Sequence, residues 1–217
     1  MSDVRSKTLL VLVGMKREAR IVGEGAVIGA AGLAAAMARR PAGIVSFGLC
    51  GGLDPALKAG DLVVGTGVNG TPTDAAWANR LTAALPGAHR GDFTSGGAMA
   101  ATPRDKAVLR RQTGAAAVDM ESHALTGAGL PFAILRAVSD PAGRALPRAA
   151  QAGFKADGEI DVGAVLRALL ARPAELPALF RTAREAGAAF RSLRDARHLL
   201  GPGLGCPYLV QHPIDMA

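Results

Sequence analysis

Residues 43–54 read GIVSFGLCGGLD, a nearly unbroken apolar run that ends in a glycine-rich turn. Apolar runs without alternation are typical of strands that are buried on both faces, as in parallel sheets covered by helices. The predicted strands of this kind lie at residues 8–13, 43–47, 62–68, 115–120 and 131–138. Helical patterns alternate with them, at residues 30–40, 74–84, 103–112 and 122–128. This alternation predicts an α/β fold, a single-domain three-layer α/β/α sandwich with a central mixed, mostly parallel sheet.

The C-terminal part of the chain has a different pattern and predicts a helical extension. One amphipathic helix is expected over residues 161–170, and a second begins near Pro173 and Pro177, because proline is tolerated in a first helical turn. Apolar side chains of the second helix recur at spacings of three, four and seven, with arginines between them. Two interpretations remain: the helix packs on its own domain or a partner subunit, or it lies on an anionic membrane surface. We divide the chain into a main α/β domain, residues 1–172, and a basic amphipathic helix with an irregular tail, residues 173–217.

Composition and charge limit the classes of function. The formal net charge is +7, but no run of Lys and Arg is interleaved with aromatic residues, so nucleic-acid binding is not expected. Cys50 and Cys206 form neither a disulfide framework nor a metal-ligand spacing, which predicts a reducing, cytoplasmic setting and no metal. Residues 1–7 are polar, without a segment of signal-peptide type, and no apolar run is long enough to span a bilayer.

Two polar or glycine-rich segments follow the first two predicted strands, at the edge where α/β sheets bind their ligands. Residues 13–20 contain Glu18, which is either a general base beside backbone amides and arginines or a partner in an ion pair on a solvated helix. In residues 46–54, glycines let the backbone approach a ligand closely. The G-x-G-x-x-G spacing of dinucleotide enzymes is missing there, and we expect Cys50 to be a small buried hydrophobe.

Carboxylates follow two later strands. Strand alternation in the sequence AVDMESHA places Asp119 and Glu121 on one side and Met120 on the other. A carboxylate is a good acceptor for the paired hydroxyls of a ribose. In the sequence LRAVSDP, Asp140 either caps a turn or protonates a leaving group while Ser139 holds it in place.

In this order the segments resemble the nucleoside phosphorylase/nucleosidase superfamily, and most closely its methylthioadenosine/S-adenosylhomocysteine nucleosidase branch. The resemblance covers residues 8–170 and is carried by GMKRE, FGLCGGL, VDME and RAVSD, at residues 14–18, 47–53, 118–121 and 136–140. The short form, the DMESHA segment and the basic C-terminal extension resemble the hopanoid-associated nucleosidases, which are linked to the removal of adenine from adenosylhopane.

The resemblance implies roles for individual residues. Asp140 would protonate N7 of the departing adenine with Ser139 orienting it, and Glu18 would position the attacking water. Glu121 would bind the ribose hydroxyls, and Met120 would pack against the sugar. The remaining expected substrate contacts are Asp119, Met99, Leu49, Cys50, Gly51 and Gly14.

The implied activity is cleavage of the N-glycosidic bond of an adenine nucleoside by water, without a cofactor, on adenosylhopane. Three alternatives remain: phosphorolysis, a methylthioadenosine/S-adenosylhomocysteine substrate, and a catalytically silent nucleoside-binding scaffold. For phosphorolysis the candidate anion ligands are Arg17, Arg20, Arg136 and Arg144. We further expect a homodimer, and peripheral contact with the inner face of the membrane through residues 174–200.

Overall fold

The structure, a computed structural model, describes residues 8–153, 159 and 161–209. The polar N-terminus at residues 1–7 and the end of the predicted tail, residues 210–217, lie outside the described residues. The strands are β1 (Leu9–Val13), β2 (Ala26–Ile28), β3 (Gly43–Gly52), β4 (Leu62–Val68), β5 (Thr71–Pro72), β6 (His89–Ser95), β7 (Ala117–Asp119) and β8 (Phe132–Asp140). The α-helices are α1 (Lys16–Val22), α2 (Gly29–Ala36), α3 (Ala75–Ala84), α4 (Pro103–Thr113), α5 (Arg148–Ala152), α6 (Val162–Ala171) and α7 (Leu176–Leu200). Short 3-10 helices are η1 (Met37–Arg39), η2 (Ser122–Leu125) and η3 (Pro173–Glu175).

Strand β3 is the centre of the sheet. It pairs in parallel with β1 and β8, and its last residues, Gly51 and Gly52, pair antiparallel with β7. Strand β8 continues antiparallel to β4, which runs parallel to β6, and β6 runs parallel to β7. The pairings therefore close into a ring through β3, β8, β4, β6 and β7, while β2 extends the sheet from β1. The sheet is mixed and mostly parallel, as predicted.

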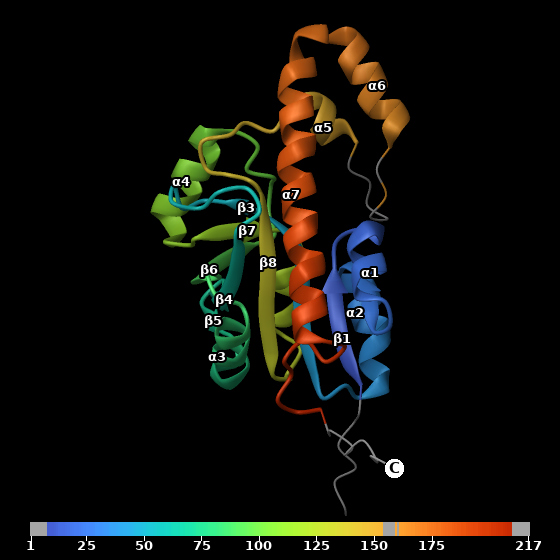
Figure 1. Cartoon of the computed structure of the whole chain (residues 1–217), viewed down its shortest axis with the longest axis vertical. Helices are drawn as coiled ribbons and strands as arrows, with labels where there is room; N and C mark the ends of the chain where they lie inside the picture. The colour runs from blue at the N-terminus through green and yellow to red at the C-terminus, as the bar shows by residue number, and fades with distance from the viewer. Residues whose placement is uncertain (1–7, 154–158, 160, 210–217) are drawn as a thin grey trace, which may run out of the picture.

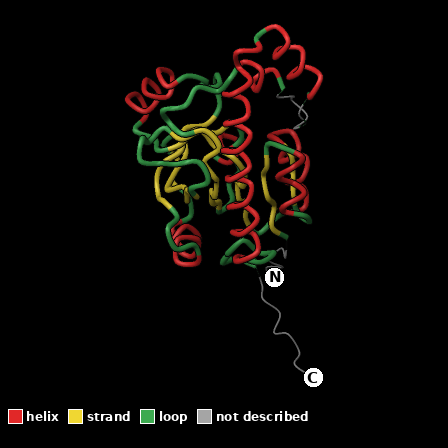
Figure 2. Tube along the Cα trace, turned by 45° about the horizontal axis from the view of Figure 1, so that its top comes forward, coloured by secondary structure: helices red, strands yellow, loops and turns green. Residues whose placement is uncertain are grey.

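Alternate residues of the strands pack into two apolar clusters, one on each face of the sheet. On one face, Val11 of β1 belongs to the cluster that contains Leu81 of α3 and Leu193 of α7. On the other face, Leu12 of β1 belongs to the cluster that contains Leu33 of α2. Figure 2 shows the strands in the centre with helices on both sides. The three-layer arrangement predicted from the sequence is confirmed.

The differences from the prediction have local causes. Strand β6 was not predicted because its sequence is polar, and Phe93 and Ser95 are its two buried residues. Strands β2 and β5 are too short to give a periodic pattern. The predicted helix at residues 122–128 is only the 3-10 helix η2, because the hydroxyl of Ser122 bonds back to Asp119 at the end of β7.

Helix α7 lies along β8 (Figure 1) and contributes to the core through its second half. Ala189, Phe190, Leu193 and Ala196 are buried, so this half packs on its own domain. The first half of α7 and helix α6 form a hairpin that projects beyond the sheet (Figure 1). This hairpin exposes five large apolar side chains, Val162, Leu166, Leu170, Leu176 and Phe180. Among the described helices, none combines the length and the apolar character needed to cross a membrane.

Substitutions of two leucines on α7 test whether the second half of this helix packs on the sheet. Leu193→Ala removes a side chain that is 0% exposed and should lower the free energy of unfolding by about 2–5 kcal/mol. The matched control Leu199→Ala, on the same helix at 66% exposure, should change it by less than about 0.5 kcal/mol. Urea denaturation followed by circular dichroism measures both, and equal effects would contradict the packing of α7 on the sheet.

Candidate active site

Glu18 is buried in the first turn of α1, just after β1, and accepts three backbone hydrogen bonds. Its Oε2 accepts from the N–H groups of Gly14 and Met15 at 2.8 and 2.9 Å. Its Oε1 accepts from the N–H of Leu49 on β3 at 2.7 Å. Burial raises the pKa of Glu18 above its usual value, although the charge of Arg136 and these amides act in the opposite direction. A raised pKa suits a carboxylate that accepts a proton near neutral pH.

Arg136 on β8 is a buried guanidinium that connects two carboxylates to β3. Its Nη1 lies 3.0 Å from Oε2 of Glu121 and donates to the carbonyl oxygen of Leu49 at 2.9 Å. Its Nη2 donates to Oγ of Ser46 at 2.6 Å. Its Nε lies 2.9 Å from Oδ2 of Asp119 as an ion pair without hydrogen-bond geometry. Glu121 is therefore held from inside the protein.

The charge of Arg136 is maintained by its neighbours. Burial by itself lowers the pKa of Arg136, but the charges of Asp119, Glu121 and Glu18 outweigh it and raise the pKa above its usual value. The guanidinium is thus a permanently charged group close to the carboxylates of Asp119, Glu121 and Glu18.

Asp119 and Glu121 share one side of their segment, as strand alternation predicted, and both contact Arg136. Met120 between them is exposed. The carboxylate of Asp119 is buried and also accepts from the N–H and the hydroxyl of Ser122. This placement does not support the expected contact of Asp119 with substrate, because its partners lie within the protein.

Asp140, at the end of β8, is fixed by two side chains. Ser139 Oγ donates to Oδ1 of Asp140 at 2.7 Å and lies 3.2 Å from the carbonyl oxygen of Cys50. Lys106 Nζ of α4 lies 2.6 Å from Oδ2. The side chain of Asp140 remains 18% exposed, so part of the carboxyl group is open to a ligand.

Lys106 is a site residue that the sequence reasoning missed. It follows the capping box of Thr102 and Asp105 on a helix whose composition is polar, which is typical of a solvated lysine. The one available signal is its spacing of three to Leu109, which packs against a small apolar cluster. That spacing places Lys106 on the inner face of α4.

The end of β3 brings together the carboxylates of Glu18, Glu121 and Asp140. The N–H of Leu49 donates to Glu18. The carbonyl oxygen of Leu49 accepts from Arg136, which in turn holds Glu121. Two residues further along, Gly51 pairs with Asp140. In an extended strand this step is about 7 Å. Glu18 and Asp140 thus reach the same sheet edge at positions two residues apart on β3.

The other expected substrate contacts are two glycines, Cys50 and Met99. Gly14 and Gly51 allow close approach, since a Cβ would lie 2.5 Å from Glu121 Oε1 and 3.2 Å from Asp140 Oδ2 respectively. Cys50 is buried, and burial raises the pKa of its thiol well above the usual value, in keeping with a small hydrophobe rather than a nucleophile. Met99 is exposed in the loop between β6 and α4.

Three of the four arginines considered for phosphate contact other side chains of the protein, and Arg20 lies in a groove beside Arg17. Arg17 stacks on Phe190 at 4.0 Å, and with Arg20 it lines a groove between α1 and α7. Arg144 pairs with Glu185 of α7 at 3.3 Å. Arg136 is enclosed by its carboxylates. The predicted anion site is therefore not formed by these residues.

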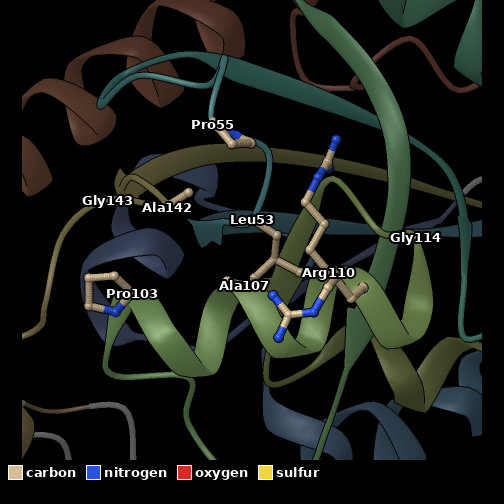
Figure 3. A pocket seen from close by; sticks show the side chains of 9 residues that line it. Leu53, Pro55, Pro103, Ala107, Arg110, Gly114, Ala142 and Gly143 are labelled. Carbon is tan, nitrogen blue, oxygen red and sulfur yellow. The ribbon is translucent and has the colours of Figure 1, made fainter.

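A cavity of about 580 Å³ lies beside the site (Figure 3). Pro103, Ala107 and Arg110 of α4 line it on one side, and Ala142 and Gly143 of the loop after Asp140 line it on another. None of the carboxylates described above lines it. The cavity is thus a neighbour of the site and does not contain its chemistry.

Comparison with known proteins identifies the family and similar folds. The model of the family described as the Phosphorylase superfamily matches residues 9–171. The 5′-methylthioadenosine/S-adenosylhomocysteine nucleosidase of Helicobacter pylori has a TM-score of 0.57 at 15% identity, over 87% of this chain and 97% of that one. The nucleosidase of Neisseria meningitidis gives 0.55 at 19%, over 87% and 98%. The futalosine hydrolase of Helicobacter pylori gives 0.56 at 16%, over 88% and 98%.

No curated protein sequence matches the chain. The similar structures, all at low identity, establish the fold, and the family match covers most of the sequence. The chain therefore belongs to the phosphorylase superfamily.

Proposed function

We propose that the chain is a nucleosidase that hydrolyses the N-glycosidic bond of an adenine nucleoside. The observation that carries this proposal is the meeting of Glu18, Glu121 and Asp140 at the end of β3, each held by different partners. Glycosidic cleavage has an oxocarbenium-like transition state and requires a proton donor for the leaving group and a held nucleophile. The three carboxylates supply these functions and a sugar ligand.

Asp140 is the proposed acid. It transfers its proton to N7 of adenine while the electrons of the bond from C1′ to N9 move onto the base. Ser139 donates to Oδ1 of Asp140, and Lys106 donates to Oδ2. Together these two bonds fix the plane of the carboxyl group of Asp140. Adenine departs neutral.

Glu18 is the proposed acceptor for water. Its carboxylate takes one proton while the water oxygen bonds to C1′, so the products are adenine and the free sugar. Glu121, oriented by Arg136, accepts the ribose hydroxyls. Met120 packs against the sugar in this proposal, and Met99 and Leu49 contribute apolar contacts.

Hydrolysis is favoured over phosphorolysis by the charges near Glu18. A buried carboxylate beside Glu121 repels a phosphate dianion, and three of the four candidate arginines, Arg17, Arg136 and Arg144, contact other side chains of the protein. Water has no such requirement for a cation. A methylthioadenosine or S-adenosylhomocysteine substrate would use the same three carboxylates.

For the substrate we propose adenosylhopane, cleaved to adenine and ribosylhopane. The resemblance to the hopanoid-associated nucleosidases supports this choice, as do the exposed apolar residues of the α6–α7 hairpin. The hairpin projects from the end of the sheet where β8 terminates (Figure 1). The first half of α7 is joined to the loop after β8 by the ion pair of Arg144 with Glu185.

We also propose that this hairpin contacts the inner face of the membrane. Leu166 and Leu170 are one turn apart on α6 and exposed, and Arg167 and Arg172 lie beside them. Apolar side chains next to arginines are typical of contact with anionic lipid. The proposed surface differs from the expected residues 174–200: it adds α6 and leaves out the second half of α7, which packs on the sheet through Phe190 and Leu193. A cytoplasmic homodimer remains our expectation.

Two substitutions test the catalytic assignment. Asp140→Asn and Glu121→Gln should each lower adenine release by about 10²-fold or more, since each removes a group that acts on the transition state. The exposed Asp195→Asn on α7 is the control and should keep wild-type activity. Adenine is quantified by liquid chromatography with adenosine, methylthioadenosine and adenosylhopane as substrates, with and without phosphate. Strict dependence on phosphate, with a sugar 1-phosphate as product, would sink the hydrolytic mechanism.

The pH profile tests Glu18. Because burial raises its pKa, Glu18 gains a proton at a higher pH than the ordinary value of 4.5. Since the carboxylate must be ionised to accept a proton from water, kcat/KM should fall on the acid side with a midpoint above 4.5. Glu18→Gln should lose about 10²-fold in kcat/KM and no longer show this acid limb. A midpoint at or below 4.5 in the wild type would count against Glu18 as the acceptor.

Vesicle sedimentation tests the hairpin. The triple substitution Leu166→Ser, Leu170→Ser and Phe180→Ser should weaken binding to phosphatidylglycerol-containing vesicles by about tenfold or more for each inserted side chain. Leu199→Ser, exposed at the other end of α7, is the matched control. Equal sedimentation of all three proteins at low salt would show that the hairpin is a packing or assembly element.

A further inference from the structure

Lys106 is a buried lysine whose ammonium group lies against the acid. Its side chain is 0% exposed. Nζ donates to Oδ2 of Asp140 at 2.6 Å and to the carbonyl oxygens of Asp140 and Pro141 at 2.8 and 3.0 Å. The carbonyl oxygen of Arg144 lies 3.4 Å away. An ammonium group has three protons, so these acceptors use all of them.

Stability alone does not explain a lysine at this position. Removing two charges from water is costly, and replacing a buried ion pair by apolar residues of similar volume is often neutral or stabilising. The surroundings of α4 are apolar, with Leu53, Val118 and Leu109 in the adjoining cluster. A lysine here is therefore better explained by what its charge does for Asp140.

We propose that Lys106 is a positioning residue for Asp140, one that fixes its carboxyl group and stabilises the negative charge left when the proton passes to the base. The proposal rests on the function proposed above. In this step the proton leaves Asp140 for N7, and the bond between C1′ and N9 breaks with its electrons on the base. Asp140 becomes a carboxylate beside the ammonium of Lys106, which keeps its own protons. Solvent returns a proton to Asp140 after adenine leaves.

The charged groups around Asp140 make Lys106 its specific partner. Lys106 from α4 is the cation in ion-pair contact with Asp140 among the described residues. Arg144, in the following loop, pairs with Glu185, and Arg136, on the same strand, pairs with Asp119 and Glu121. From β3, Asp140 is faced by the thiol of Cys50, which burial keeps neutral.

This arrangement predicts the effect of removing the charge. A positive charge beside a carboxyl group stabilises its ionised form. Without Lys106, the carboxylate formed in the reaction loses its counter-charge, so kcat should fall while KM changes little. A lysine that only supported the fold would change kcat only together with the thermal midpoint.

The test compares Lys106→Gln, which keeps N–H donors for the loop carbonyls, with Lys106→Met, which keeps only the volume. Arg104→Gln on the same helix, exposed to solvent, is the matched control. The substrate is whichever of adenosine, methylthioadenosine and adenosylhopane the wild type cleaves fastest. The measurements are kcat and KM of adenine release and the thermal midpoint of each variant.

We expect Lys106→Gln to lower kcat by about 10- to 100-fold, part of the general-acid contribution, with little change in KM or in the thermal midpoint. Lys106→Met should show the same split between kcat and KM, and Arg104→Gln should match the wild type. Activity of Lys106→Gln within twofold of wild type, or a loss of kcat that is matched by a loss of thermal stability in both variants, would overturn the proposal. Failure of both neutral variants to fold would also overturn it and make Lys106 a structural residue.

Asp140→Asn separates this proposal from the proposed function. If Asp140→Asn leaves adenine release unchanged, the acid itself is wrongly assigned and the function fails. If Asp140→Asn inactivates the enzyme while Lys106→Gln keeps the wild-type rate, only the role of Lys106 fails.

Discussion

The ion pairs of the buried Arg136 guanidinium join the fold to the site. The contacts of Arg136 with Ser46 and Leu49 fasten β8 to β3, and those with Asp119 and Glu121 hold two carboxylates in a low-dielectric interior. Like charges this close would otherwise disfavour ionisation. Removing one partner of such a buried pair costs about 3–5 kcal/mol, because the other charge is left uncompensated. The orientation of Glu121 is therefore fixed by the same guanidinium that joins β8 to β3.

Close approach of backbone and carboxylate is the second constraint. Each proposed functional carboxylate has a glycine against it: Gly48 beside Glu18, Gly14 beside Glu121 and Gly51 beside Asp140. A Cβ at Gly48 or Gly14 would overlap the neighbouring carboxylate. The glycines after β1 and in β3 thus serve as packing partners of charged side chains, which explains a glycine-rich segment without the spacing of a phosphate-binding loop.

The sequence was sufficient for the layers and for the meeting of Glu18 and Asp140, because these residues follow β1 and β8, which both run parallel to β3. Glu121 follows β7, which runs antiparallel to β3, so strand direction alone did not place it there. The sequence was insufficient where side-chain direction depends on docking. Lys106 lies in a polar helix, and only the way α4 packs turns it inward. The same periodic pattern runs through both halves of α7, yet Leu193 is buried and Phe180 is exposed. The periodicity of apolar residues shows which face of a helix is apolar, but it does not show what packs against that face.

In the proposed mechanism, the two buried cations act on the two sides of the glycosidic bond, Arg136 on the sugar side and Lys106 on the base side. A guanidinium presents a planar fork of donors, so Arg136 can hold several acceptors at once on the sugar side. An ammonium is a compact charge, so Lys106 can serve a single carboxyl group and the carbonyl oxygens of one loop on the base side. Glu18, by contrast, is held by neutral amides, and burial raises its pKa despite the nearby Arg136. In the proposed mechanism, the group that gains a proton is thus separated from the group that loses one, and the two-residue step along β3 from Leu49 to Gly51 sets that separation.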